Sequence, residues 1–123
     1  SMTTLEKFLE LRSFVNNVEK KSLVYGASFS EFVILRAVQA EGANGIRRVD
    51  LAERVGLSIS GTTRALQPLE KLGYIQTQDE TLDARVRKVA LTESGRALFA
   101  DITKDVQRRM EEITPGLQEI LKP

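Results

Sequence analysis

The sequence predicts a mainly α-helical fold with one small β-hairpin. Three observations support this prediction: apolar residues recur every three and four positions over most of the chain, two helical patterns meet at a tight turn, and two short strand patterns follow them. These features stand between Val49 and Gly95 in the order helix, turn, helix, hairpin. That order is typical of a winged helix-turn-helix, flanked here by N- and C-terminal helices.

The first helix of this segment has three apolar side chains on one face, Leu51, Ala52 and Val55. Gly56 is expected to end the helix, because glycine adopts the positive φ of a C-terminal cap without a steric penalty. We expect Leu57 to fold back onto the core. Ser58 is a predicted N-cap for the second helix, which should continue to about Leu72.

The second helix has two faces. Its apolar stripe, which we expect to face the core, consists of Ile59, Thr62, Leu66, Leu69 and Leu72. The other face has short hydrogen-bonding side chains, one cation and no carboxylate, which suits contact with phosphates and base edges: Ser58, Ser60, Gly61, Thr63, Arg64 and Gln67. The alternative is an ordinary solvated face. Pro68 predicts a slight bend without a break.

The hairpin begins at Tyr74 and returns through a strand from Lys88 to Thr92. The segment between the strands is polar, and it ends in a basic edge typical of a wing. The candidate DNA contacts of the wing are Asp83, Arg85, Arg87 and Lys88. Thr92 is a predicted N-cap for the last helix, which opens with Glu93.

The motif Asp83-Ala84-Arg85, followed by Leu91-Thr92 and the helix start Glu93-Ser94-Gly95-Arg96, resembles the MarR family of bacterial transcription regulators. The resemblance covers nearly all of the chain. It implies that Arg85 enters the DNA minor groove and that Asp83 orients it. The alternative for this pair is an exposed ion pair of little energetic value. The chain departs from the family at Gln76 and Gln78, where relatives often have arginine.

Both ends of the chain have more apolar surface than one neighbouring helix requires. The N-terminal set is Leu5, Phe8, Leu9, Leu11, Phe14, Val15 and Val18, and the C-terminal set is Leu98, Phe99, Ile102, Val106, Met110 and Ile113. The family resemblance implies a homodimer formed through these helices, with a pseudopalindromic operator in double-stranded DNA. Thr114-Pro115-Gly116 predicts a break that leaves a short final helix.

MarR relatives often bind a small aromatic or anionic effector between their dimerisation helices and the winged module. The residues that would line this site here are Asn17, Lys21, Tyr25, Phe29 and Arg36. The alternative is that Phe29 belongs to the core and that Lys21 is solvated, as is usual in amphipathic helices.

Composition agrees with a single domain over residues 1–123, divided into support and dimerisation helices at 5–46, the winged module at 47–92 and dimerisation helices at 93–123. The chain has no cysteine and no histidine, which argues against disulfides, thiol sensing and the usual metal sites, so we expect no metal and no cofactor. No long apolar run or signal-peptide pattern is present, so a cytoplasmic location without membrane contact is expected.

The formal net charge is only +1, and residues 47–96 hold nine Lys/Arg against seven Asp/Glu, a balance of +2. Arg47 and Arg48, just before the first helix of the motif, are predicted phosphate contacts, with a solvated loop as the alternative. The leading hypothesis is a sequence-specific, ligand-responsive repressor. A winged-helix protein-interaction module without DNA binding is the alternative. An enzyme is disfavoured, since the sequence lacks histidine, cysteine and a phosphate-binding glycine motif.

Overall fold

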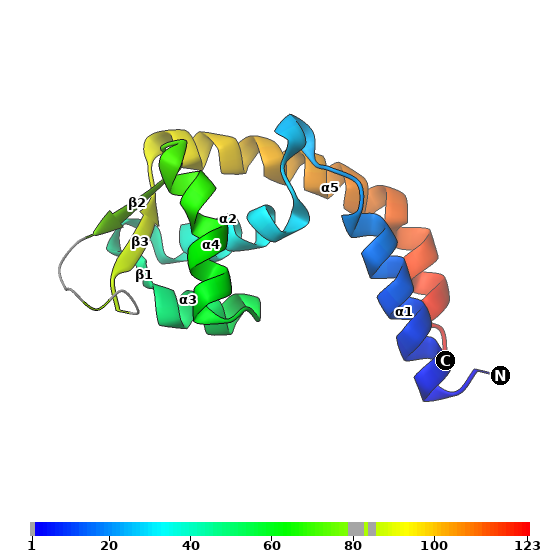
Figure 1. Cartoon of the computed structure of the whole chain (residues 1–123). Helices are drawn as coiled ribbons and strands as arrows, with labels where there is room; N and C mark the ends of the chain where they lie inside the picture. The colour runs from blue at the N-terminus through cyan, green and yellow to red at the C-terminus, as the bar shows by residue number, and fades with distance from the viewer. Residues whose placement is uncertain (1, 79–82, 84–85) are drawn as a thin grey trace. The chain divides into compact units, whose positions relative to one another are not determined.

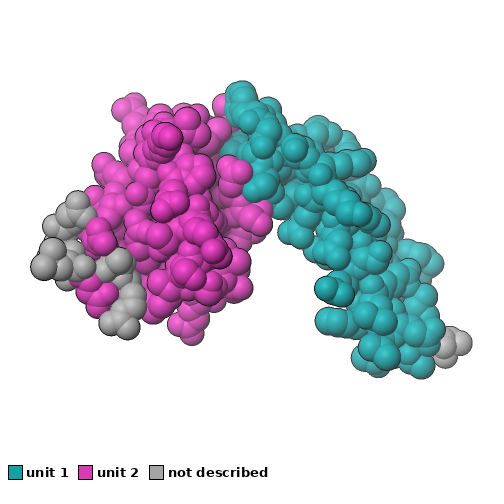
Figure 2. Space-filling model, viewed as in Figure 1, with its two compact units in different colours: residues 1–29, 102–123 teal, residues 30–101 magenta. Residues whose placement is uncertain are grey.

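The computed structural model describes residues 2–78, 83 and 86–123 of the chain. Arg85, the predicted wing arginine, lies outside the described residues. The chain forms two compact units, one of residues 1–29 with 102–123 and one of residues 30–101 (Figure 2). The assignment of residues 1–123 to a single domain stays a prediction.

The second unit contains the winged module. Its elements in chain order are α2 (Phe29–Glu41), the 3-10 turn η2 (Gly42–Asn44), β1 (Ile46–Arg47), α3 (Arg48–Val55), α4 (Ile59–Lys71), β2 (Ile75–Gln78), β3 (Lys88–Leu91) and the start of α5 (Glu93–Leu121) (Figure 1). The prediction of a mainly helical fold with a small wing is confirmed.

The three strands form one antiparallel sheet in the order β1-β3-β2. The hairpin register pairs Ile75 with Leu91 and Gln78 with Lys88, as the wing prediction requires. β1 was not predicted, because a strand of two residues has no measurable periodicity. It pairs Ile46 with Val89 and thereby ties the start of α3 to the base of the wing.

The core of the second unit is formed by side chains that are almost fully buried: Ile34, Leu35, Val38, Leu51, Leu66, Leu69 and Val89. Two predicted core residues are wrong, because Leu57 and Leu72 are 42% and 68% exposed. Leu57 lies in the turn after α3. α4 ends at Lys71, and the Tyr74 amide donates to the Leu69 carbonyl at 2.9 Å, so the chain leaves the helical stripe before Leu72.

The first unit contains α1 (Thr4–Glu19), the 3-10 turn η1 (Val24–Gly26) and the remainder of α5. The predicted break at Thr114-Pro115-Gly116 is wrong, since α5 continues to Leu121. Pro115 removes only the amide that would reach the Glu111 carbonyl, and Glu111 is exposed, so water can satisfy that carbonyl. A Cβ at Gly116 would lie 2.8 Å from the Phe14 ring, so glycine lets α1 approach α5 closely.

None of the helices in the described part of the chain combines the length and the apolar character needed to span a membrane.

Candidate nucleic-acid interface

The turn between α3 and α4 is built by two local caps. Gly56 ends α3 in the left-handed region, with φ of 74° and ψ of 30°. The Ser58 hydroxyl accepts a hydrogen bond from the Gly61 amide at 3.0 Å and so caps the N-terminus of α4. Both capping predictions are confirmed, and together they set where α4 begins.

α4 separates its two faces clearly. Thr62, Leu66 and Leu69 are buried, whereas Ser60, Arg64 and Gln67 are exposed. Gly61 and Thr63, also predicted on the outer face, are half-buried. The exposed face therefore carries one guanidinium, one amide and one hydroxyl, all of which can hydrogen-bond base edges or phosphate oxygens.

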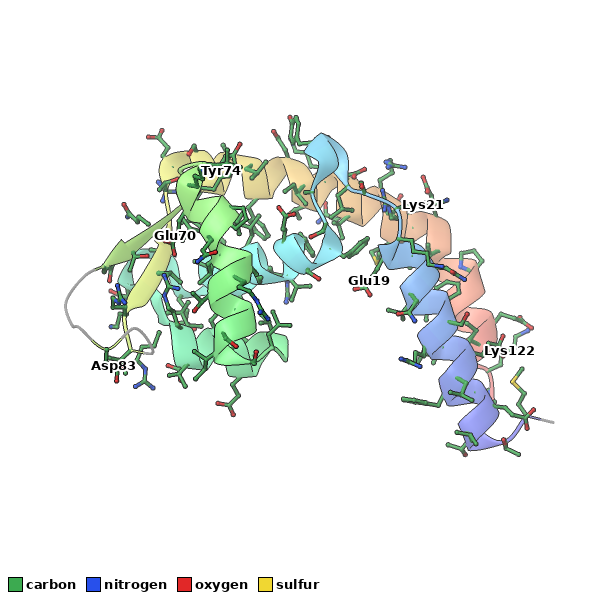
Figure 3. All side chains as sticks on the ribbon, in the orientation of Figure 1. Glu19, Lys21, Glu70, Tyr74, Asp83 and Lys122 are labelled. Carbon is green, nitrogen blue, oxygen red and sulfur yellow. The ribbon has the colours of Figure 1, made fainter. Side chains whose placement is uncertain are left out.

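The described part of the wing places Asp83 at the surface, and Arg87 and Lys88 half-buried where the descending strand begins. The Val86 amide donates to the Asp83 carbonyl at 3.2 Å. Asp83 is labelled in Figure 3. The roles predicted for these residues in DNA contact stay predictions.

Arg47 lies at the surface, where its guanidinium forms a bidentate ion pair with Asp50, at 2.7 Å from Nε and 3.1 Å from Nη2. These hydrogen bonds from Arg47 lower the pKa of the Asp50 carboxyl. An exposed pair of this kind has little energetic value, so the guanidinium can exchange Asp50 for a phosphate. Arg47 remains a candidate phosphate contact.

Arg48 is not on the surface, which corrects its predicted role as a phosphate contact. The residue is 7% exposed, and its Nη2 atom forms an ion pair with Glu70 at 2.6 Å. Nη1 lies 3.4 Å from the Thr63 hydroxyl, and Nη2 lies 3.3 Å from the Thr77 hydroxyl. A phosphate could reach this guanidinium only if the surrounding elements separated. Sequence reasoning missed Glu70 and Thr77 as its partners.

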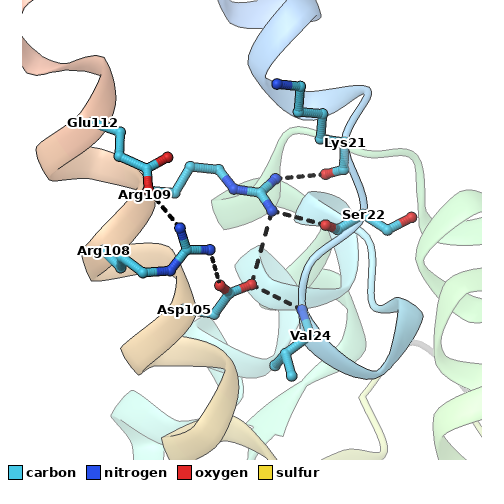
Figure 4. Close-up of polar contacts among 7 residues, drawn as sticks. All are labelled: Lys21, Ser22, Val24, Asp105, Arg108, Arg109 and Glu112. Atoms are coloured by element: carbon cyan, nitrogen blue, oxygen red, sulfur yellow. Dashed lines mark hydrogen bonds and ion pairs between the residues drawn. The ribbon is translucent and has the colours of Figure 1, made fainter.

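A second polar cluster lies in the first unit, around Asp105 of α5 (Figure 4). Its carboxylate accepts hydrogen bonds from Arg108 at 2.6 Å and from the Val24 amide at 2.8 Å. These two hydrogen bonds, the one from Arg108 first, lower the pKa of Asp105. Arg109 donates to the carbonyls of Lys21 and Ser22 at 2.7 and 2.8 Å. The cluster therefore fastens the segment after α1 to α5.

The predicted effector residues are only partly brought together. Asn17 and Lys21 line one groove of about 550 Å³ within the first unit. The Phe29 ring lies under the Arg109 guanidinium, with 5.7 Å between Cζ and the ring centroid. Tyr25 is 71% exposed, and Arg36 belongs to the other unit.

Comparison with known proteins supports the fold and the family. A protein-family profile described as "Winged helix-turn-helix DNA-binding" matches residues 30–76. The chain is 30% identical over 93 residues to the HTH-type transcriptional regulator SarZ of Staphylococcus epidermidis, a match that covers 76% of this chain and 56% of SarZ. These matches identify a winged helix-turn-helix like that of HTH-type transcriptional regulators, in agreement with the resemblance to the MarR family.

Solved structures of similar fold extend over most of the chain. A probable transcriptional regulator from Pseudomonas aeruginosa has a TM-score of 0.76 at 18% identity, covering 93% of this chain and 90% of that one. A MepR variant from S. aureus, bound to an oligodeoxyribonucleotide, has a TM-score of 0.63 at 19% identity, covering 94% and 84%. The chain spans a little over half the length of the curated relatives it matches.

Proposed function

We propose that this protein is a sequence-specific DNA-binding transcription regulator of the MarR type. The observation that carries the proposal is the exposed face of α4, where Ser60, Arg64 and Gln67 stand opposite the buried stripe of the same helix. The β2–β3 hairpin belongs to the same compact unit. A helix with such a face fits the major groove, and a hairpin beside it fits the neighbouring minor groove.

In this mechanism Arg64 and Gln67 read base edges, because guanidinium and amide groups can make paired hydrogen bonds to guanine and adenine. Arg47 contacts a phosphate and fixes the register of the protein on the duplex. Arg85 enters the minor groove, where narrow A·T-rich tracts attract guanidinium groups. The solved complex of a MepR variant with an oligodeoxyribonucleotide supports this mode of binding, because the MepR variant has a similar fold.

We also propose a homodimer formed through α1 and the C-terminal part of α5. The support is a row of exposed apolar side chains on these helices: Leu5 (65%), Phe8 (61%), Leu9 (50%), Val15 (42%) and Leu121 (63%). Apolar groups gathered in this way mark an interaction surface in most proteins. A two-fold dimer presents two copies of α4, so its operator is a pseudopalindrome with half-sites about one turn of DNA apart.

The effector hypothesis has weaker support and concerns the groove next to Lys21. Apolar side chains from Phe14, Val18 and Ile113 line it together with three cationic side chains and one carboxylate, that of Glu112. The excess of cations over carboxylates beside an apolar wall suits a small aromatic anion. A ligand that binds there and changes the spacing of the two α4 helices would release the operator, as expected of a ligand-responsive repressor. A cytoplasmic location also stays a prediction.

The decisive experiment is selection of binding sites from random duplex DNA. We expect the wild type to enrich an inverted repeat and Arg85→Ala to fail, with operator affinity lower by about 1–3 kcal/mol and a salt slope flatter by roughly one charge. Arg54→Ala, which removes an exposed arginine from α3, is the matched control and should enrich the same repeat. No enrichment by the wild type at low salt would contradict the proposal and favour a protein-interaction module.

A further inference from the structure

Arg48 is a buried cation whose side-chain partners come from two other elements, α4 and β2. It begins α3, and its guanidinium contacts Thr63 and Glu70 on α4 and Thr77 on β2. Its own amide donates to the Arg87 carbonyl, just before β3, at 3.2 Å. The side chain and the main chain of one residue therefore join α3 to α4, to β2 and to the residue that precedes β3.

The contacts on α4 are spaced so that one guanidinium can set the orientation of the helix. Thr63 and Glu70 are seven residues apart, which places them on one face at a separation of roughly 10 Å along the axis. Thr63 neighbours Arg64 in the part of α4 proposed to read bases, while Glu70 lies in the last turns, where Figure 3 labels it. Contacts at two points along a helix restrict its rotation and its tilt.

The contact with β2 extends this restriction to the wing. Thr77 belongs to the ascending strand and pairs with Val89 of β3. The Arg48 Nη2 atom contacts both Glu70 of α4 and Thr77 of β2, so this one nitrogen restricts the distance between the two elements. The planar guanidinium suits this task, since it presents its donors in a fixed fork, whereas the lysine ammonium is a point charge on a longer flexible stem.

Stability alone is a weak explanation for a cation at this place. A buried ion pair loses hydration that its mutual attraction often only balances, so an apolar pair of similar volume is frequently as stable. The Nε atom of Arg48 is also buried and has no hydrogen-bond partner among the described residues, which adds to the cost of burial. An apolar pair in place of Arg48 and Glu70 could not make the directional hydrogen bonds to Thr63 and Thr77.

We propose that Arg48 is a positioning residue that fixes the recognition helix α4 and the wing strand β2 at the spacing needed to read an operator. The inference rests on the proposed DNA-binding function. In this role Arg48 affects how well the protein distinguishes its operator from other sequences, although Arg48 itself does not contact DNA. Arg48→Lys keeps a cation next to Glu70 and loses the fork, so this variant is expected to fold and to discriminate poorly.

The test compares affinity for the selected operator with affinity for random duplex, at a temperature where circular dichroism shows every variant folded. For Arg48→Lys we expect operator affinity to fall by about tenfold or more, while random-duplex affinity changes by less than about twofold, because phosphate contacts dominate the latter. The double variant Arg48→Met/Glu70→Met, in which no buried charge is left unpaired, should show the same loss of discrimination. Arg54→Lys, at an exposed arginine of the same helix α3, is the matched control, and its ratio of affinities should equal that of the wild type.

Three outcomes would overturn the inference. If the double variant has the same ratio of operator affinity to random-duplex affinity as the wild type, the Arg48–Glu70 ion pair serves stability only. Parallel losses on operator and random duplex, with a flatter salt slope, would show that Arg48 reaches a phosphate. A wild type that selects no operator would remove the proposed function, and the role of Arg48 with it; this failure is seen before any variant is compared.

Discussion

Gly95→Ala tests how closely α5 approaches the strand segment before β2. Gly95 is buried in the first turn of α5, and a Cβ atom there would lie 2.0 Å from the Tyr74 carbonyl oxygen. That oxygen accepts a hydrogen bond from the Thr92 amide at 3.1 Å. The preceding carbonyl, of Gly73, accepts the Thr92 and Ser94 hydroxyls at 2.6 and 3.0 Å, so the strand end is held in place by several bonds.

We expect Gly95→Ala to lower the free energy of unfolding, although helix propensity alone would predict an increase. Alanine in place of glycine stabilises an ordinary helix by about 1 kcal/mol. Overpacking a well-packed site costs about 1–3 kcal/mol, and this clash is with backbone that cannot rotate away, so the upper end applies. The net loss in free energy of unfolding is therefore about 2 kcal/mol, with a decrease in Tm of roughly 5–10 °C.

Urea denaturation followed by circular dichroism measures this change as a lower midpoint at constant slope. Gly116→Ala is the comparison in the same helix, because its Cβ would meet only the Phe14 ring edge, at 2.8 Å. A side chain can shift, so we expect a smaller loss. If Gly95→Ala proves as stable as the wild type or more stable, the close approach of α5 to Tyr74 is refuted.

Ser58→Ala should lower the free energy of unfolding by about 1 kcal/mol, since the Gly61 amide loses its cap; an unchanged urea midpoint would contradict this. Asp105→Asn should remove a pH-dependent part of stability. The pKa of Asp105 is lowered in the folded state, so its contribution to stability is present above the ordinary pKa of an aspartate and is lost as pH falls through the lowered pKa. The free energies of unfolding of wild type and variant should therefore converge in acid and differ most at neutral pH. A difference in free energy that stays constant with pH would refute this. Phe8→Glu, at a 61% exposed position of α1, should convert a dimer to a monomer in analytical ultracentrifugation, whereas an unchanged mass would place the dimer contact elsewhere.

Features that depend on a few neighbouring residues were predicted correctly. The cap at Ser58 bonds an amide three residues away, and the left-handed end at Gly56 needs only a glycine in that position. Thr92 caps α5 in the same way, with its hydroxyl accepting from the Gly95 amide at 3.0 Å. Such features are local, because both partners lie within one turn of chain.

Two features that depend on residues distant in the sequence were predicted incorrectly. Arg47 and Arg48 are identical in type and adjacent in sequence, yet one lies on the surface and the other is buried. The helix break predicted at Pro115 fails because the exposed side of α5 tolerates the missing amide and because Gly116 packs against Phe14 of α1. Nothing in the residues next to these positions distinguishes the two outcomes.

By itself the sequence determined the order of helices and strands, the positions of the caps and the polar face of α4, because periodicity and capping act over a few residues. Only the tertiary structure decided which cations face solvent and which hold the module together. The partners of Arg48 lie 22 and 29 residues further along the chain, at Glu70 and Thr77. A charged side chain is buried only where other elements supply its counter-charge and hydrogen bonds, and the fold alone brings them together.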